Sequence, residues 1–293
     1  MRRFRALGGS IHPFYRSILL RAVNAGFELP STDCQRLQNT LVAALAIGGV
    51  WARLDYFYPL ATHGLTTATL GFAGINWIQP NNPLSNVSAA VNVNKKGIYG
   101  ALQYGFNFNT MSVMQAPYGG TPSNYYEQGG CMFCMLGVAG GTPVTVEGAI
   151  AIQGTTPPAN ENWQTIRFRT VPRVDYLMNS ETGVPGELQA GIPVVQRIYG
   201  IDRVNRLSDS QIRNTGWWGG VQKWHTSAGS MGYPMASPNL QTGSPINSNL
   251  PSTRALALVG GGASLFAPAY TAGLYTVLDT AVQNYFNALQ TLP

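Results

Sequence analysis

Beyond residue 61 the sequence consists of short apolar runs that are separated by Gly, Pro and Asn. Runs of this kind between turn residues are typical of β-strands, and many of them in one chain favour a sandwich or jelly roll. Alternation is clearest at 163–171, where Ile166 and Phe168 would face one side of a sheet and Arg167 and Arg169 the other. The predicted strands are 69–78, 89–93, 99–108, 131–138, 144–152, 163–171, 194–201, 217–226 and 254–259. Stretches 79–86 and 228–253 are rich in Pro, Asn, Ser and Gly, and are predicted as long loops.

Helical patterns lie at the two ends of the chain. A first helix is predicted from Pro13 to about Gly26, and a second begins at Ser31 or Thr32, whose side chains can cap the free amides of a helix. Gly48 and Gly49 would end the second helix. A short amphipathic turn at 50–54 and an aromatic strand at 55–60 are expected to follow.

The last helix is predicted to begin at Pro268. Its apolar side chains recur at helical spacing along one side, and Asp279 is its only charge. Such a stripe must be covered, either by the sheet of its own chain or by a neighbouring subunit. The stripe comprises Tyr270, Leu274, Leu278, Ala281, Val282, Tyr285 and Leu289.

Composition favours a component of an assembly over a free enzyme. Charged residues make up 10% of the chain, against about 25% in ordinary soluble domains. With 45% hydrophobic residues, this low charge suggests surfaces that neighbours cover. No apolar run approaches the roughly 18 residues that a transmembrane helix needs, so no membrane span is expected.

The N-terminal segment is basic. Five arginines precede the first acid, Glu28, so residues 1–27 carry a charge of +5. We expect an assembly arm that binds other proteins of a particle, and nucleic acid would be contacted only through this arm. The arginines are Arg2, Arg3, Arg5, Arg16 and Arg21.

Three groups of residues carry a resemblance. They are the Gly-Val-Trp-Ala-x-Leu-Asp-x-Phe segment at 49–57, Ile75-Asn76-Trp77, and the segments 96–100 and 107–109. Together with the helix before the first segment and the C-terminal helix, they resemble structural proteins encoded by phages and prophages of Bacteroidetes-type bacteria. The resemblance implies a concanavalin-like jelly roll and a place in the tail, fibre or capsid.

Pattern and resemblance together predict a mainly β chain: a jelly-roll, concanavalin-like β-sandwich with N-terminal helices and a C-terminal helix. Residues 1–58 would be a basic arm and helical entrance that anchors the chain in the virion. Residues 59–266 would be the sandwich. Residues 267–293 would be a helix packed on the sandwich or on a subunit interface.

The expected function is that of a non-enzymatic virion protein, in a capsid, spike or tail fibre. Such a protein makes contacts with other virion proteins and displays loops outward. A homo-oligomer is expected, and the resemblance to spikes and fibres suggests a trimer. The alternatives are a lectin-like module that binds host-surface carbohydrate and, ranked below it, a glycoside hydrolase.

The three cysteines are expected to be structural. Cys131 and Cys134 have the C-x-x-C spacing of redox and zinc sites, but a structural zinc needs about four ligands. The other candidate ligands are Cys34 and three isolated histidines. In a strand, residues three apart point to opposite faces. We therefore expect buried thiols, no metal site and no cofactor.

The acidic residues do not form a catalytic pattern. Glycosidases use two carboxylates at a fixed separation, whereas here no two acids lie two apart on a predicted strand. Glu181 and Glu187 flank a Gly-Pro loop in which solvent exposure is expected. Gly260, Gly261 and Gly262 lack the lysine of a phosphate loop, so they are expected to let the chain leave its last strand.

Aromatic side chains give the best candidate for a binding surface. Exposed tryptophans can stack on sugar rings or on a partner protein, with neighbouring Lys and His as hydrogen-bonding groups. The alternative is that adjacent tryptophans point to the core and to a subunit interface. The candidates are Trp217, Trp218, Lys223, Trp224 and His225, with Tyr125 and Tyr126 as a second, weaker pair.

Overall fold

The computed structural model describes residues 10–65, 71–80, 85–86, 91–100, 114–117, 130–137, 147–153, 163–169, 173–180, 187–190, 198–203, 210–213, 217–220, 239–242, 256–265 and 273–293. All structural statements below refer to these residues. They form mainly antiparallel β-sheet with α-helices from both ends of the chain, which confirms the expected fold class at this level.

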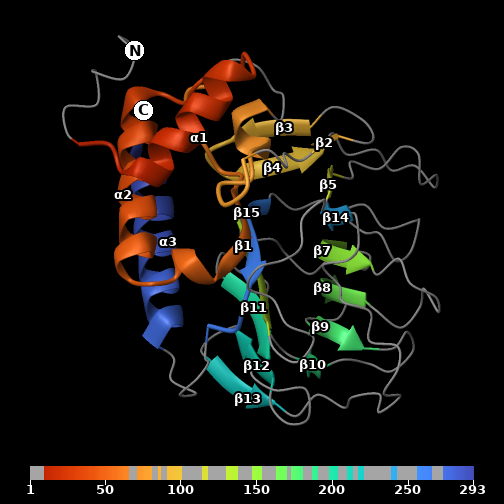
Figure 1. The fold of residues 1–293 in the computed structure, drawn as a ribbon. Coiled ribbons are helices and arrows are strands. Elements are labelled where there is room, and N and C mark those ends of the chain that lie inside the picture. Colours follow the sequence, from red (N-terminus) through yellow and green to blue (C-terminus); the bar gives the residue numbers. More distant parts are fainter. Residues whose placement is uncertain are drawn as a thin grey trace.

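The first sheet has eight strands, which pair antiparallel (Figure 1). One of the eight strands, β1 (Leu54–Pro59), pairs with β15 but has no place of its own in the linear order of the other seven. One row of paired residues crosses four neighbouring strands of this sheet: Asp202 lies opposite Cys131, Cys131 opposite Gly262, and Gly262 opposite Leu54. The order is β13 (Trp217–Gly220), β12 (Ser210–Arg213), β11 (Ile198–Arg203), β6 (Gly130–Leu136), β15 (Leu256–Gly262), β4 (Gly97–Gly100) and β3 (Val91–Asn94).

The second sheet has seven strands, also antiparallel, and lies beside the first sheet on the side away from the helices (Figure 1). Strand β9 contacts β11 of the first sheet. The order is β10 (Glu187–Ala190), β9 (Arg173–Ser180), β8 (Trp163–Arg169), β7 (Glu147–Gln153), β14 (Asn239–Thr242), β5 (Met114–Pro117) and β2 (Ser85–Asn86). Strand β14 lies inside the stretch 228–253 that was predicted as a loop, so that prediction is wrong at 239–242.

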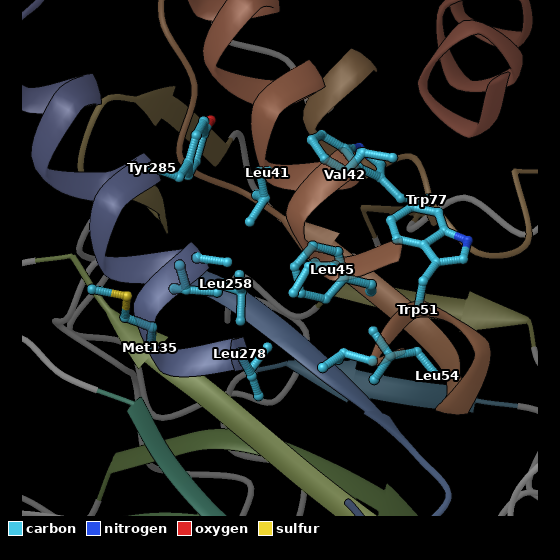
Figure 2. Close-up of a cluster of buried hydrophobic side chains, with 14 of the residues drawn as sticks. Leu41, Val42, Leu45, Trp51, Leu54, Trp77, Met135, Leu258, Leu278 and Tyr285 are labelled. Carbon is cyan, nitrogen blue, oxygen red and sulfur yellow. The ribbon is translucent and has the colours of Figure 1, made fainter. Parts of the chain in front are cut away.

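Helices cover the other face of the first sheet. They are α1 (Pro13–Asn24), α2 (Thr32–Ile47) and α3 (Gly273–Thr291), and α2 packs along α3 (Figure 1). Between helices and sheet lies one cluster of buried apolar side chains, which includes Leu41, Leu45, Met135, Leu258 and Leu278 (Figure 2). The C-terminal helix thus covers the sheet of its own chain. Within the described ranges, none of the helices combines the length and the apolar character that crossing a bilayer requires.

The ends of α2 follow its sequence. Ser31 is the N-cap, and its Oγ accepts a hydrogen bond from the Cys34 N–H at 3.3 Å. The same Oγ lies 2.9 Å from Nδ1 of His63, which joins the start of α2 to the chain that leaves β1. At the other end Gly49 has φ +79°, a left-handed conformation that glycine adopts without strain. The predicted cap and stop are therefore confirmed.

The segment 71–78 is not a strand, which corrects the prediction for 69–78 over these residues. It begins with a 3-10 turn, η3 (Gly71–Gly74), and then runs beside β1. Oδ1 of Asn76 accepts the N–H of Phe57 at 3.1 Å and that of Ile78 at 3.0 Å, and the Trp77 N–H donates to the Phe57 carbonyl at 2.8 Å. A side-chain amide thus takes the place of a neighbouring strand along part of β1.

The three glycines 260–262 have a different role from the one predicted. They lie inside β15, between β1 and β6, rather than after the last strand. A methyl group at Gly260 would collide with the ring of Phe133, at Gly261 with the Tyr56 ring and its hydroxyl, and at Gly262 with the Arg53 carbonyl. Glycine is required here because side chains and backbone approach the strand too closely for any Cβ.

Candidate functional site

Of the predicted binding residues, the structure describes the backbone of Trp217 and Trp218. They lie on β13, the last strand in the order of the first sheet, opposite Arg213 and Ile212 of β12. Lys223, Trp224, His225, Tyr125 and Tyr126 lie outside the described residues. The binding surface predicted from these aromatic residues stays a prediction.

The predicted arm divides at Pro13. Arg2, Arg3 and Arg5 lie outside the described residues, whereas Arg16 and Arg21 are on α1. Nε of Arg21 donates to the carbonyl of Pro80 at 3.1 Å and so ties α1 to the segment after η3. Because the inner side of α1 (Tyr15, Ile18, Leu19, Ala22) is buried, α1 belongs to the folded body. An arm can therefore comprise only residues before Pro13.

The outer side of α1 combines apolar and basic side chains. Leu20 is 42% exposed and Val23 39% exposed, and Arg16 is exposed on the same helix. Phe14 is 46% exposed and stacks on Trp51, with ring centroids 5.3 Å apart and 6° between the planes. Arg16, Leu20 and Val23 stand at i, i+4 and i+7 and so share the outer face of α1, whereas Phe14 lies on the flank that meets Trp51.

A buried polar cluster joins the three helices to the end of β1. The Tyr15 hydroxyl donates to Oε1 of Gln38 at 2.6 Å, and Nε2 of Gln38 lies 3.4 Å from the Tyr285 hydroxyl and 3.5 Å from Oγ1 of Thr62. Tyr285 in turn donates to the Ala61 carbonyl at 2.8 Å, and the Cys34 thiol lies 3.6 Å from Oγ1 of Thr62. Satisfied buried networks of this kind fix one relative position of the elements that they join.

A second buried cluster surrounds Asp202 on β11. Its Oδ1 accepts from the Ser264 hydroxyl at 2.5 Å, and its Oδ2 accepts from the Leu265 N–H at 2.7 Å and from the Tyr275 hydroxyl at 2.8 Å. Ser264 and Leu265 follow β15, and Tyr275 is in the first turn of α3. One carboxyl group therefore connects the sheet, the segment after its last strand, and the C-terminal helix.

Burial dominates the electrostatics of this cluster. It raises the pKa of Asp202 to about 7, although three hydrogen bonds and the charge of Arg53 act in the opposite direction. The pKa of the Cys131 thiol is raised by burial and then by Asp202, and the pKa of Tyr275 is raised by burial and by the same carboxyl group. Asp202 can thus exchange a proton near neutral pH, whereas the thiol and the phenol stay protonated.

Neither cluster is arranged to act on a substrate. Asp202, Gln38, Tyr15 and Tyr275 have no solvent-exposed surface, so a substrate cannot reach them. Within the described ranges, no three His, Cys, Asp or Glu side chains come together in a way that would hold a metal ion. Cys131 belongs to the apolar cluster beneath the helices, and Cys134 does not. The two thiols therefore face opposite sides of β6, as predicted from their spacing of three in a strand.

The sequence analysis did not find either buried cluster. Asp202 directly follows the apolar run Ile-Tyr-Gly-Ile that ends the predicted strand 194–201, a position at which an acid is not unusual. The three donors are 62 to 73 positions further along the chain. Tyr15 and Gln38 likewise sit in amphipathic helices without any local sign of their partners.

Comparison with known proteins gave no sequence relative. No family model matches the chain, and no curated protein matches it. Three solved structures share part of its shape. The apo Crh5 transglycosylase has a TM-score of 0.39 and 13% identity, covering 71% of this chain and 83% of that chain. Crh5 transglycosylase in complex with NAG has a TM-score of 0.36 and 13% identity, covering 61% and 78%.

The third structure is a mutant of Trypanosoma rangeli sialidase displaying trans-sialidase activity. Its TM-score is 0.46 with 9% identity, and the match covers 86% of this chain but 39% of the sialidase chain. All three structures are of enzymes, and this contradicts the expectation that the present chain is not an enzyme. Every TM-score is below 0.5, so the matches assign no activity to the chain.

Proposed function

We propose that the chain is a structural component of a bacteriophage virion, in which the two sheets form a concanavalin-like jelly roll. The observation that supports this proposal is the helical layer. Helices from both ends of the chain lie together on one face of the first sheet, and the outer face of α1 offers apolar and basic side chains side by side. A layer of this kind suits attachment to a neighbouring protein, and the second sheet lies on the other side of the first sheet (Figure 1).

The basic residues before α1 extend the same attachment. Arg2, Arg3 and Arg5 precede α1 in the sequence, and the charges of α1 itself, Arg16 and Arg21, are also positive. Such a segment favours an acidic socket on another virion protein or the packaged nucleic acid. The proposal places the attachment at residues 1–24 and the displayed surface on the opposite side of the molecule.

The experiment is to purify phage particles from a host that carries the gene and to detect the chain in them by mass spectrometry. A variant lacking residues 2–9 should fold, since those residues precede the packed helices, but should be absent from particles. A triple variant with Gln in place of Arg2, Arg3 and Arg5 should also be absent from particles. The matching triple variant with Lys keeps the charge and should be incorporated like the wild type. Purified particles that lack the wild-type chain would refute the proposal.

Carbohydrate binding is a second candidate, because Trp217 and Trp218 lie on the terminal strand of the first sheet. Among the strands that the structure describes, β13 pairs with β12 and with no other strand. A glycan array probed with the wild-type chain and with Trp217→Ala and Trp218→Ala tests this candidate. Turnover of host polysaccharide should be assayed on the same samples, and Glu181→Gln and Glu187→Gln test whether either carboxyl group takes part.

A further inference from the structure

The docking of α3 onto the sheet depends on one carboxyl group. Asp202 is the common acceptor for Ser264, Leu265 and Tyr275, and it has no exposed surface. At its other end α3 is tied to the turn between β3 and β4, where Nε2 of Gln290 donates to the Lys95 carbonyl at 2.7 Å and Nζ of Lys95 donates to the Leu292 carbonyl. These contacts hold the C-terminal end of α3 independently of Asp202.

The two oxygens of Asp202 differ in a way that allows it to hold a proton without losing a contact. Oδ2 faces two donors, the Leu265 N–H, which can only donate, and the Tyr275 hydroxyl. Oδ1 faces the Ser264 hydroxyl, which can donate or accept. A proton on Oδ1 would donate to Oγ of Ser264 while both contacts to Oδ2 persist. The neutral form is thus fully hydrogen-bonded without a buried charge.

Among the described residues, ionisable groups on η2, β1, β6 and α3 act on this cluster. Arg53 on the 3-10 turn η2 (Trp51–Arg53) favours the ionised carboxylate. Cys131 lies opposite Asp202 on β6 and stays protonated. Asp55 on β1 raises the pKa of Cys131, and Asp279 on α3 raises the pKa of Tyr275, so both keep the neighbours of Asp202 protonated. Arg53 is the one positive charge that acts on Asp202 among the described residues.

We propose that Asp202 is a proton-controlled latch for the C-terminal helix, which grips α3 when Asp202 is neutral and loosens it when Asp202 is ionised. This inference concerns the fold of the chain and does not depend on the proposed function. Loosening exposes the carboxylate to water and separates it from Tyr275. The energetic reason is that a buried charge loses its hydration, which hydrogen bonds and one arginine offset only in part.

The direction of the pH effect follows from the two pKa values. With α3 docked the pKa of Asp202 is about 7, and in water its ordinary value is 3.8. Protonation of Asp202 therefore stabilises the docked helix. This stabilisation is complete at pH values below 3.8, and it is lost as the pH rises through about 7. Between pH 5 and pH 8 the docking equilibrium should weaken by a factor on the order of 10 to 100.

Hydrogen–deuterium exchange of the full chain, corrected for the intrinsic effect of pH, tests the latch. Amides of α3 in the wild type should lose protection as the pH rises from 5 to 8. In Asp202→Asn, which cannot ionise, their protection should not depend on pH. Asp279→Asn removes a charge from the same helix without touching the latch, and should keep the wild-type pH dependence.

Tyr275→Phe gives an independent measurement in case Asp202→Asn does not fold. The Tyr275 hydroxyl stabilises the ionised carboxylate, so its removal should shift the midpoint of the pH transition upward. Three results would overturn the proposal: equal pH dependence in wild type and Asp202→Asn, protection of α3 that grows with rising pH, or an unchanged midpoint in Tyr275→Phe.

Discussion

The side chain of Asn76 serves as a backbone partner for Phe57. Its Oδ1 accepts the Phe57 N–H at 3.1 Å, and the residue after it, Trp77, donates its own N–H to the Phe57 carbonyl at 2.8 Å. The pair protects part of the edge of β1 that β15 does not cover. This gives a physical reason for an Asn next to a Trp in this segment, which the sequence presents only as a motif.

Asn76→Ala should therefore destabilise the protein strongly. The change removes the acceptor of two N–H groups, on Phe57 and Ile78, and each unsatisfied buried group costs about 1–3 kcal/mol. We expect a loss of about 2–4 kcal/mol in the free energy of unfolding, measured by denaturant titration. Asn287→Ala, at an exposed position of α3, is the matched control and should change stability by less than about 0.5 kcal/mol. Similar results for the two variants would contradict this role of Asn76.

Leu278→Ala tests how α3 is covered. Leu278 has no exposed surface and lies in the cluster between the helices and the first sheet (Figure 2). Removal of its side chain should cost about 2–5 kcal/mol, while Thr280→Ala at an exposed position of the same helix should have little effect. Because α3 packs on its own chain, the oligomeric state measured by light scattering should not change. Dissociation of an oligomer by Leu278→Ala would show that the helix also serves an interface.

Gly261→Ala tests the close approach at β15. The added methyl group would meet the Tyr56 ring and the carbonyl of Cys131, neither of which has room to move. Overpacking of this kind costs about 1–3 kcal/mol and often more. Gly26→Ala is an informative comparison, since Gly26 has φ +71° and open space around it. That variant measures backbone strain alone, about 1–2 kcal/mol. Thermal unfolding of both variants should rank Gly261→Ala as the more damaging.

The cysteine thiols should be inert in the folded protein. Cys34, Cys131 and Cys134 are buried and free, and burial raises the pKa of each thiol above its ordinary value of 9.0. The raised pKa keeps each thiol protonated at pH 8, so the reactive thiolate does not form. A chromogenic disulfide reagent should label none of them until denaturant is added, and then all three. Ser17→Cys places a thiol on an exposed position of α1 and should react at once; a fast native thiol in the wild type would overturn the structural role.

The elements that could be predicted are those whose cause is local. The α2 helix carries its own start and stop in Ser31 and Gly49, and the buried stripe of α3 recurs at helical spacing, so both follow from neighbouring residues. The segment 71–78 could not be predicted because it meets β1 through the Asn76 side chain and the Trp77 N–H rather than through a ladder of strand hydrogen bonds. Apolar residues at that spacing are read as a strand, and nothing local shows that Asn76 faces Phe57.

The buried clusters lay beyond sequence reasoning for a related reason. Asp202 is an ordinary acid until Ser264, Leu265 and Tyr275 arrive from the far end of the chain. Glycines 260–262 look like a flexible exit from a strand, and only the positions of Phe133, Tyr56 and Arg53 show that space is the constraint. The same limit applies to the expected lack of enzymatic activity, which rested on missing local motifs.

The pairing of β1 with β15 has a consequence for synthesis of the chain. Tyr285 donates its hydrogen to the carbonyl of Ala61, 224 positions earlier, and β1 needs β15 as its partner. On the ribosome, α1, α2 and β1 emerge well before the strand β15 and the helix α3 that cover them. Their apolar faces stay uncovered while the intervening residues are made, at risk of aggregation. The first sheet can therefore close only after β15 has left the ribosome, about 200 residues after β1.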